Sequence, residues 1–146
     1  MTSVIPRGII YRNLSDEFLN LFKSIFFSLE DTNEVESFEK VFANYNTSKY
    51  CVAFPFARTA FYSILKLQHL KEGDEVILPP IQIKPMLEVV LNLKLKPVIV
   101  DIDPKTLSFD LKILKKKINS KTKAILLTYL YGIVPNINKI KKILGK

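Results

Sequence analysis

The chain has 146 residues, of which 48% are hydrophobic and 25% are charged, and this size and composition are typical of one ordinary globular domain. Its one cysteine, Cys51, excludes an internal disulfide and fits a reducing compartment. No apolar stretch is long enough to span a bilayer as a helix, and the first ten residues lack a signal-peptide pattern, so we expect a soluble, cytoplasmic protein without a membrane span.

The formal net charge of +8 is unevenly distributed along the chain. Residues 94–146 hold thirteen lysines against three aspartates, whereas residues 1–93 carry a small excess of acids. A basic half can indicate a nucleic-acid partner. However, the lysines alternate with leucine and isoleucine at helical spacing, and no aromatic and basic motif accompanies them. We therefore favour solvated helix faces and expect no nucleic acid as a partner.

Two amphipathic helices are predicted in the first third of the chain, at 14–29 with Ser15 as the N-cap and at 32–45. From residue 50 onward, apolar runs alternate with segments of helical period. The apolar runs are predicted as strands at 50–54, within 71–79, at 96–103 and at 123–130. The periodic segments are predicted as helices at 59–70, 84–93, 110–118 with Asp110 as the N-cap, and from 136 on.

Because the predicted strands are apolar along their whole length, they favour a parallel sheet that is covered by helices on both faces. The sequence thus predicts an α/β fold, a three-layer αβα arrangement with a mainly parallel sheet, as a single domain over 1–146 with N-terminal helices at about 14–45. Ligands of such sheets bind at the carboxyl ends of the strands. The segments expected at that edge are FPFART (54–59), PPIQIK (79–84), DIDPKT (101–106) and YLYG (129–132).

The segment FPFART suggests a site for an anion. The first turn of a helix exposes unpaired N–H groups and the positive end of the helix dipole. Ala57 is small, Thr59 offers a hydroxyl, and Arg58 is unfavourable at this end of a helix unless an anion is bound there. On this argument alone, an Arg58 that points to solvent is an equal alternative. The chain has neither a GxGxxG nor a Walker A sequence, which disfavours ordinary dinucleotide or P-loop binding.

Other polar residues give no catalytic or metal site. His69 has no cysteine or acidic partner at metal-ligand spacing, so no metal is predicted. Asp101 and Asp103 lie two residues apart on one side of a strand, and a strand-end and turn-forming role is favoured over a catalytic pair. Tyr129 and Tyr131 fit a place in the site and a place in a turn equally well.

The order of several motifs resembles a known family. FEKVFANY, FPFARTAFYSILKL, GDEVILPP, LKPVIVDIDPKTLSFD and KTKAILLTYLYG resemble, in that order, the N-terminal half of the DegT/DnrJ/StrS family over about residues 35–143. These proteins are aminotransferases of nucleotide-linked sugars that use pyridoxal 5'-phosphate and have the aspartate-aminotransferase type of fold. The resemblance implies this cofactor, a nucleotide-sugar substrate, glutamate as amino donor, a homodimer, and a place in surface glycan (polysaccharide) biosynthesis.

The resemblance also implies which residues bind the cofactor. The Ser-Gly-Thr with which the family holds the phosphate falls on Ala57, Arg58 and Thr59, and an arginine at the glycine position resembles a variant subset of the family. The aromatic residue that stacks on the cofactor ring falls near Ile83, which can cover the ring by apolar contact. Tyr129 replaces the histidine of the family's HLYG.

The family's domain is more than twice as long as this chain. Its Schiff-base lysine, and the acid that pairs with the pyridine nitrogen, fall beyond Lys146, so no catalytic residue is predicted within the chain. The resemblance therefore implies an incomplete enzyme that is inactive by itself. The alternative is a non-catalytic fragment or degenerate homologue that binds a phosphorylated ligand or a partner chain.

Overall fold

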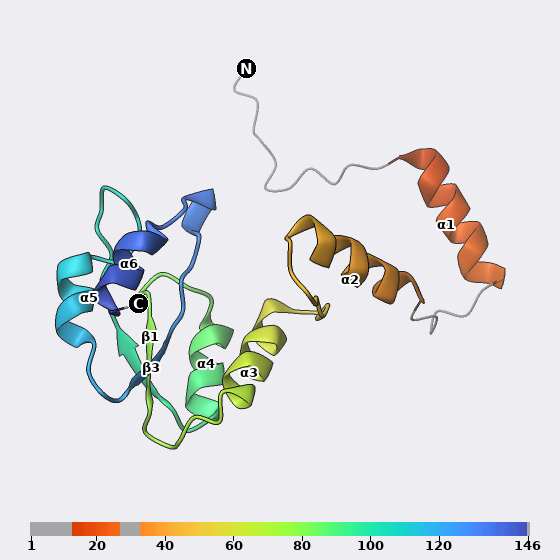
Figure 1. Ribbon diagram of the computed structural model, residues 1–146. Helices are drawn as coiled ribbons and strands as arrows, with labels where there is room; N and C mark the ends of the chain where they lie inside the picture. The colour runs from red at the N-terminus through yellow and green to blue at the C-terminus, as the bar shows by residue number, and fades with distance from the viewer. Residues whose placement is uncertain (1–12, 27–32, 146) are drawn as a thin grey trace. The chain divides into compact units, whose positions relative to one another are not determined.

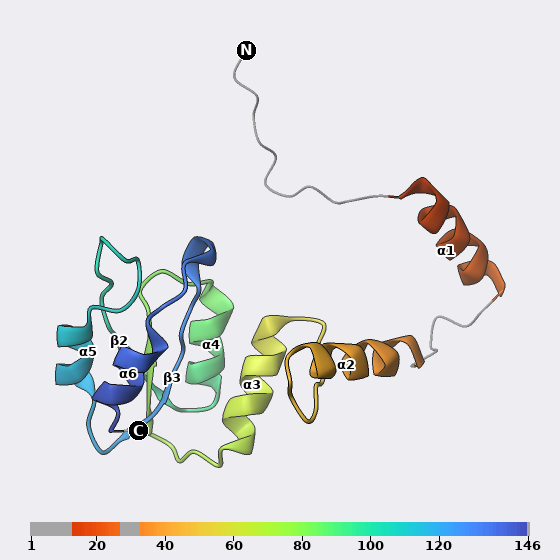
Figure 2. The same ribbon diagram turned by 45° about the horizontal axis from the view of Figure 1, so that its top comes forward.

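The computed structural model describes residues 13–26 and 33–145, which fall into two compact units, 1–53 and 54–146 (Figures 1 and 2). The prediction that residues 1–146 form one domain stays a prediction, and each unit is described by itself. Among the described residues, no helix combines the length and the apolar composition that crossing a bilayer requires.

The first unit contains helices α1 (Leu14–Phe26) and α2 (Asn33–Tyr45), at the positions where two helices were predicted. Residues 27–29 of the first predicted helix lie outside the described residues. The prediction of Ser15 as the N-cap is wrong. The Oδ1 atom of Asn13 accepts the backbone N–H of Ser15 at 3.3 Å and its hydroxyl at 2.7 Å, so the cap lies two residues earlier.

The strand predicted at 50–54 is absent from the structure, where this segment is irregular. A strand needs a neighbouring strand for its backbone groups, and none of the described strands pairs with this segment. The backbone N–H of Ala53 instead donates to Oε1 of Glu39 at 2.7 Å. Val52, in the middle of this apolar run, is 66% exposed.

The second unit is built on a parallel sheet of three strands, β1 (Glu75–Leu78), β2 (Lys96–Ile99) and β3 (Thr122–Ile125). Their order is β2-β1-β3, so β1 is central, with Val76 opposite Pro97 on one side and Ala124 on the other. All four residues of β1 are buried, as the continuous apolar run predicted.

Helices cover both faces of this sheet (Figure 1). They are α3 (Ala57–Leu67), α4 (Lys84–Asn92), α5 (Leu111–Lys117) and α6 (Ile137–Ile143), with a short 3-10 turn, η1, at Leu130–Gly132. Val76 and Leu78 of β1 pack in one core with residues of α3 and α4, whereas Ile77 packs in a second core with residues of α5 and α6. Alternate residues of one strand therefore face opposite layers, and the predicted three-layer αβα arrangement is confirmed.

Helices α5 and α6, which share one face of the sheet, each begin at a residue whose side chain caps the helix. Oδ1 of Asp110 accepts the backbone N–H groups of Lys112 at 2.7 Å and Ile113 at 3.1 Å, which confirms the predicted N-cap. Oδ1 of Asn136 accepts the N–H of Lys139 at 3.0 Å in the same way. Each cap satisfies N–H groups that a helix start otherwise leaves unpaired.

Glu75 is a buried charged residue at the amino edge of the sheet, with 5% of its surface exposed. Its Oε1 accepts from Nζ of Lys96 at 3.0 Å, and its Oε2 accepts from Nδ2 of Asn119 at 2.7 Å. The bond from Lys96 above all, and then the bond from Asn119, hold the pKa of the Glu75 carboxyl below its ordinary value of 4.5.

The ionised carboxyl of Glu75 should therefore stabilise the folded state fully at pH values above the pKa that it has in the unfolded chain. This stabilisation should be lost as the pH falls through the lower pKa that it has in the folded state. We expect Glu75→Gln to be less stable than the wild type at neutral pH, because the amide NH2 replaces one of the two carboxylate oxygens and then faces the donor from which that oxygen accepted, Lys96 or Asn119. Its stability should also decline less on acidification, as denaturant unfolding at neutral and acidic pH would measure.

Glu72→Gln is the control, because the exposed carboxylate of Glu72 forms a surface ion pair with Lys94 at 3.6 Å, and such pairs contribute little. An acid-induced loss of stability that is the same in Glu75→Gln as in the wild type would contradict this account.

Candidate functional site

The strand order places a topological switch point next to β1. The chain runs from β1 to β2 on one side and then crosses to β3 on the other, so the crevice between the carboxyl ends of β1 and β3 is the expected ligand position. The loops at 79–83 and 126–132 flank it. Helix α4 follows β1 and begins at this carboxyl edge (Figure 1). Helix α3 precedes β1, so its last residue lies at the amino edge and its first residue lies at the carboxyl edge.

The predicted anion-binding residues open α3. Ala57 is the first residue of the helix, and Ala57, Arg58 and Thr59 are all exposed. The carbonyl of Phe56 accepts the N–H of Thr59 at 3.0 Å, but the side chain of Phe56 provides no cap. Within the described part of the chain, the N–H groups of Ala57 and Arg58 have no hydrogen-bond acceptor. This helix start therefore offers two free donors, a hydroxyl and a cation to an anion.

Arg58 is held at this position by its neighbour. Its guanidinium carbon lies 3.8 Å from the centroid of the Phe56 ring, which is cation–π stacking geometry. Over the described ranges, 13–26 and 33–145, Arg58 makes no ion pair. Its charge therefore lies at the positive end of the helix dipole without a carboxylate partner among those residues, which favours the binding of an anion there.

The loop after β1 carries the second predicted residue. Ile83 is the N-cap residue of α4 and is 58% exposed, so it presents an apolar surface at the edge of the sheet. The preceding residue was not predicted from the sequence. Oε1 of Gln82 is buried and accepts no hydrogen bond from the described residues. No sequence signal marks this atom, because its burial depends on how the loop packs.

Two tyrosines lie in the loop after β3. Tyr129 is 52% exposed and Tyr131 is 85% exposed. Tyr131 adopts φ 54° and ψ 27°, a left-handed conformation that costs a residue with a side chain about 1 kcal/mol. Gly132 follows with φ 78°. Exposed aromatic rings and a strained backbone therefore occur on the β3 side of the switch point.

The two aspartates after β2 are structural, as predicted. Oδ1 of Asp103 accepts the N–H of Lys105 at 2.8 Å, and the carbonyl of Asp103 accepts the N–H of Leu107 at 2.8 Å. The carbonyl of Asp101 accepts the N–H of Asp110 at 2.9 Å. These bonds close a turn before α5, which is the role that the sequence favoured for both residues. In the part of the chain that the structure describes, no group of three or more His, Cys, Asp or Glu side chains could hold a metal ion.

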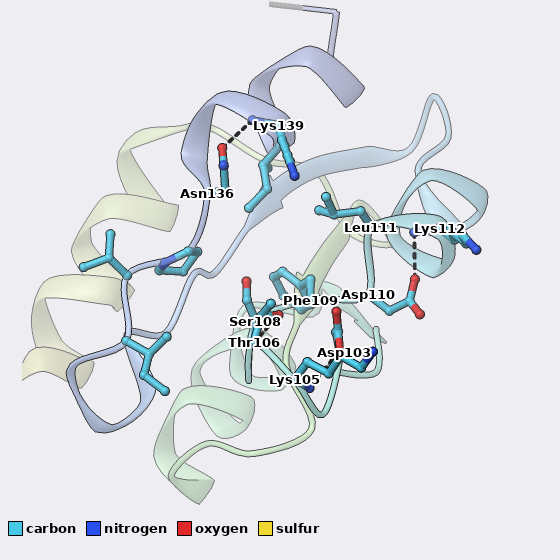
Figure 3. A pocket seen from close by; sticks show the side chains of 14 residues that line it. Asp103, Lys105, Thr106, Ser108, Phe109, Asp110, Leu111, Lys112, Asn136 and Lys139 are labelled. Carbon is cyan, nitrogen blue, oxygen red and sulfur yellow. Dashed lines mark hydrogen bonds between the residues drawn. The ribbon is translucent and has the colours of Figure 1, made fainter.

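A groove of about 660 Å³ lies between this turn and the start of α6 (Figure 3). Three of its oxygen-bearing side chains already accept backbone hydrogen bonds, since Asp103 closes the turn and Asp110 and Asn136 cap the two helices. Lys112 points away from the other labelled side chains in Figure 3. None of the residues predicted to bind the cofactor, at 57–59 and 83, lines this groove, so it is separate from the switch-point site.

Comparison with known proteins identifies similar chains. Residues 12–146 match the model of the DegT/DnrJ/EryC1/StrS aminotransferase family. A UDP-2-acetamido-2-deoxy-3-oxo-D-glucuronate aminotransferase of Pseudomonas aeruginosa is 34% identical over 113 residues, which cover 77% of this chain and 32% of the relative. A GDP-4-keto-6-deoxy-D-mannose 3-dehydratase of Yersinia pseudotuberculosis is 39% identical over 119 residues, which cover 75% of this chain and 29% of the relative.

Solved structures give the same result. The E. coli GDP-4-keto-6-deoxy-D-mannose-3-dehydratase with bound hydrated pyridoxal phosphate superimposes with a TM-score of 0.80 at 30% identity, covering 94% of this chain and 37% of that one. A Streptococcus pneumoniae putative sugar aminotransferase gives a TM-score of 0.75 at 26% identity, covering 88% of this chain and 32% of that one. The chain spans about a third of the length of the curated relatives that it matches.

Proposed function

The chain belongs to the DegT/DnrJ/EryC1/StrS aminotransferase family, and from this premise we propose that its protein is a pyridoxal-phosphate enzyme of nucleotide-linked keto-sugars. It transfers an amino group from glutamate to the sugar ketone in the cytoplasm, as a homodimer, in surface glycan biosynthesis. The observation that carries the proposal is the uncapped start of α3, with Arg58 and Thr59 exposed, at the carboxyl edge of a sheet that superimposes on a pyridoxal-phosphate-bound sugar enzyme.

The residues at this edge fit the cofactor. A phosphate matches the free N–H groups of Ala57 and Arg58, the hydroxyl of Thr59 and the guanidinium of Arg58. The exposed side chain of Ile83 offers apolar cover for a planar ring. When bound, pyridoxal phosphate supplies an electron sink for charge that develops on the substrate. The roles proposed for this chain are to bind the phosphate and to orient the ring, and none of its residues is proposed as catalytic.

A second candidate is the dehydration of a GDP-linked 4-keto-6-deoxy-sugar. It is favoured by the 39% identity to the Yersinia dehydratase and by the TM-score of 0.80 with the E. coli dehydratase. Both candidates use the same fold and the same cofactor site, and they differ in the fate of the sugar. Amino transfer makes an amino-sugar and 2-oxoglutarate, whereas dehydration removes a hydroxyl group and leaves no amine on the sugar.

The test incubates the full-length protein with pyridoxal phosphate, glutamate and a panel of GDP-, UDP- and dTDP-linked keto-sugars, and identifies the products by mass spectrometry. We expect an amino-sugar together with an equal amount of 2-oxoglutarate. A deoxygenated keto-sugar would support the dehydratase instead. Absence of any conversion, together with absence of cofactor binding, would overturn the proposal in favour of a non-catalytic homologue that binds a phosphorylated ligand or a partner chain.

A further inference from the structure

Phe56 and Arg58 make a contact at the start of α3 that phosphate binding does not itself require. Phe56 is the extended residue before the helix, with φ −146° and ψ 143°, and Arg58 is the second residue of the helix. The guanidinium carbon lies 3.8 Å from the centroid of the Phe56 ring. Long side chains of a helix lean towards its N-terminus. Arg58 therefore reaches back over the residue that carries the ring.

Stacking restrains the arginine without using its hydrogen-bond donors. The guanidinium is planar, and its five N–H groups point outward in that plane. A ring that is stacked on one face of the plane attracts the cation and leaves the N–H groups at the edge available. A carboxylate that held the same arginine would occupy two of these donors. Phe56 thus orients Arg58 and keeps it able to bind a phosphate.

A ligand can reach both side chains. Phe56 is 53% exposed, and Arg58 is exposed beside the exposed hydroxyl-bearing residue Thr59. A long side chain that becomes ordered only when a ligand binds lowers the affinity roughly 2- to 10-fold. A neighbour that already restricts the side chain in the ligand-free protein avoids part of this loss. The contact therefore has a consequence for affinity that can be measured.

We propose that Phe56 is a positioning residue, which holds the guanidinium of Arg58 over its ring in the ligand-free protein and so raises the affinity of the site for the cofactor phosphate. This inference rests on the proposed function. It adds to the same site a residue that acts through Arg58 and that neither touches the phosphate nor takes part in the reaction.

The test measures the ratio of the affinities for pyridoxal phosphate and pyridoxal in the full-length protein, because this ratio isolates the phosphate. Phe56→Leu keeps an apolar side chain but removes the ring. We expect the ratio to fall roughly 3- to 10-fold, with the affinity for pyridoxal within about 2-fold of the wild type. Phe56→Met also lacks a ring and should give the same fall, which guards against a leucine variant that folds poorly. Phe56→Tyr retains a ring and should restore most of the ratio.

A double-mutant cycle shows whether Phe56 acts through Arg58. In the Arg58→Ala background, Phe56→Leu should change the ratio by less than about 2-fold, because the side chain that the ring positions is absent. Tyr50→Leu is the matched control, since the exposed ring of Tyr50 also carries a cation, with Nζ of Lys49 at 5.2 Å from its centroid. It removes a cation–π pair outside α3 and should leave the ratio unchanged.

Three results would overturn the inference. A ratio that is the same in Phe56→Leu as in the wild type shows that the ring does not position Arg58. An equal fall in the Arg58→Ala background shows that Phe56 acts on the cofactor directly. A fall that Phe56→Tyr does not restore shows that the ring's attraction for the cation is not the cause. A wild type without any preference for pyridoxal phosphate over pyridoxal would instead count against the phosphate site of the proposed function, so the two failures are distinguishable.

Discussion

Arg58→Ala should weaken the binding of pyridoxal phosphate to the full-length protein by roughly 10- to 100-fold, which corresponds to the loss of a charge-assisted hydrogen bond worth about 1.5–3 kcal/mol. The guanidinium lies at the uncapped start of α3, where it is stacked on Phe56 and makes no ion pair within the described residues. Because the ring already restricts its orientation, little further ordering is needed when a phosphate binds. Absorbance or fluorescence titration with the cofactor measures the change.

Lys66→Ala is the control for Arg58→Ala. Lys66 is an exposed cation on the same helix but in its last turn, so its removal changes the net charge equally without touching the phosphate position. We expect its effect on cofactor affinity to be less than 2-fold, in line with screening of distant surface charges at physiological salt. Equal losses in the two variants would show that Arg58 acts only through net charge, and the proposed phosphate contact would be wrong.

The second large effect concerns the core that holds α3 in place. Leu65 is 3% exposed and packs in one core with Val76, Leu78 and Val90. Leu65→Ala should lower the free energy of unfolding by about 2–5 kcal/mol, since it removes buried methyl groups and leaves a cavity. Because α3 also carries Arg58, cofactor affinity should fall in the same variant. Denaturant unfolding measures the first effect, and cofactor titration measures the second.

Leu67→Ala provides the matched comparison, because it makes the same substitution two residues further along the helix, where the side chain is 72% exposed. Its effect on unfolding should stay within about 0.5 kcal/mol, as for other surface changes. If Leu65→Ala and Leu67→Ala destabilise the protein equally, α3 does not pack on the sheet in the way described.

The parallel sheet could be predicted because its signal is local. The runs around β1, β2 and β3 are apolar and are followed by helical periodicity, a pattern that is typical of parallel strands covered by helices. Burial along the whole strand is found in the central strand, β1. The N-cap at Asp110 could be predicted for the same reason, since the residue and the two N–H groups that it caps lie within four positions.

Features that depend on distant residues could not be predicted. The apolar run at 50–54 has strand character, but a strand forms only when it pairs with another strand, and none of the described strands pairs with this run. The cap at Asn13 rather than Ser15 is a smaller error, because two residues that both favour caps lie two positions apart.

The candidate site was predicted in part. The sequence places Ala57, Arg58 and Thr59 at the start of a helix, and the structure has them in the first turn of α3. The stacking of Arg58 on Phe56 and the unpaired acceptor of Gln82 were not predicted, since both depend on side-chain packing that has no signature in the order of residues. The sequence therefore predicted the position of the helix start, whereas the arrangement of the side chains around it came from the structure alone.

The most direct test of the account compares pyridoxal phosphate with pyridoxal, which lacks the phosphate, in binding to the full-length protein and to its Arg58→Ala variant. We expect the wild type to bind the phosphate form at least about 10-fold more tightly, and most of this preference to disappear in the variant. A wild type that binds the two forms equally well, or a preference that survives the loss of Arg58, would contradict the assignment of the start of α3 as the phosphate site.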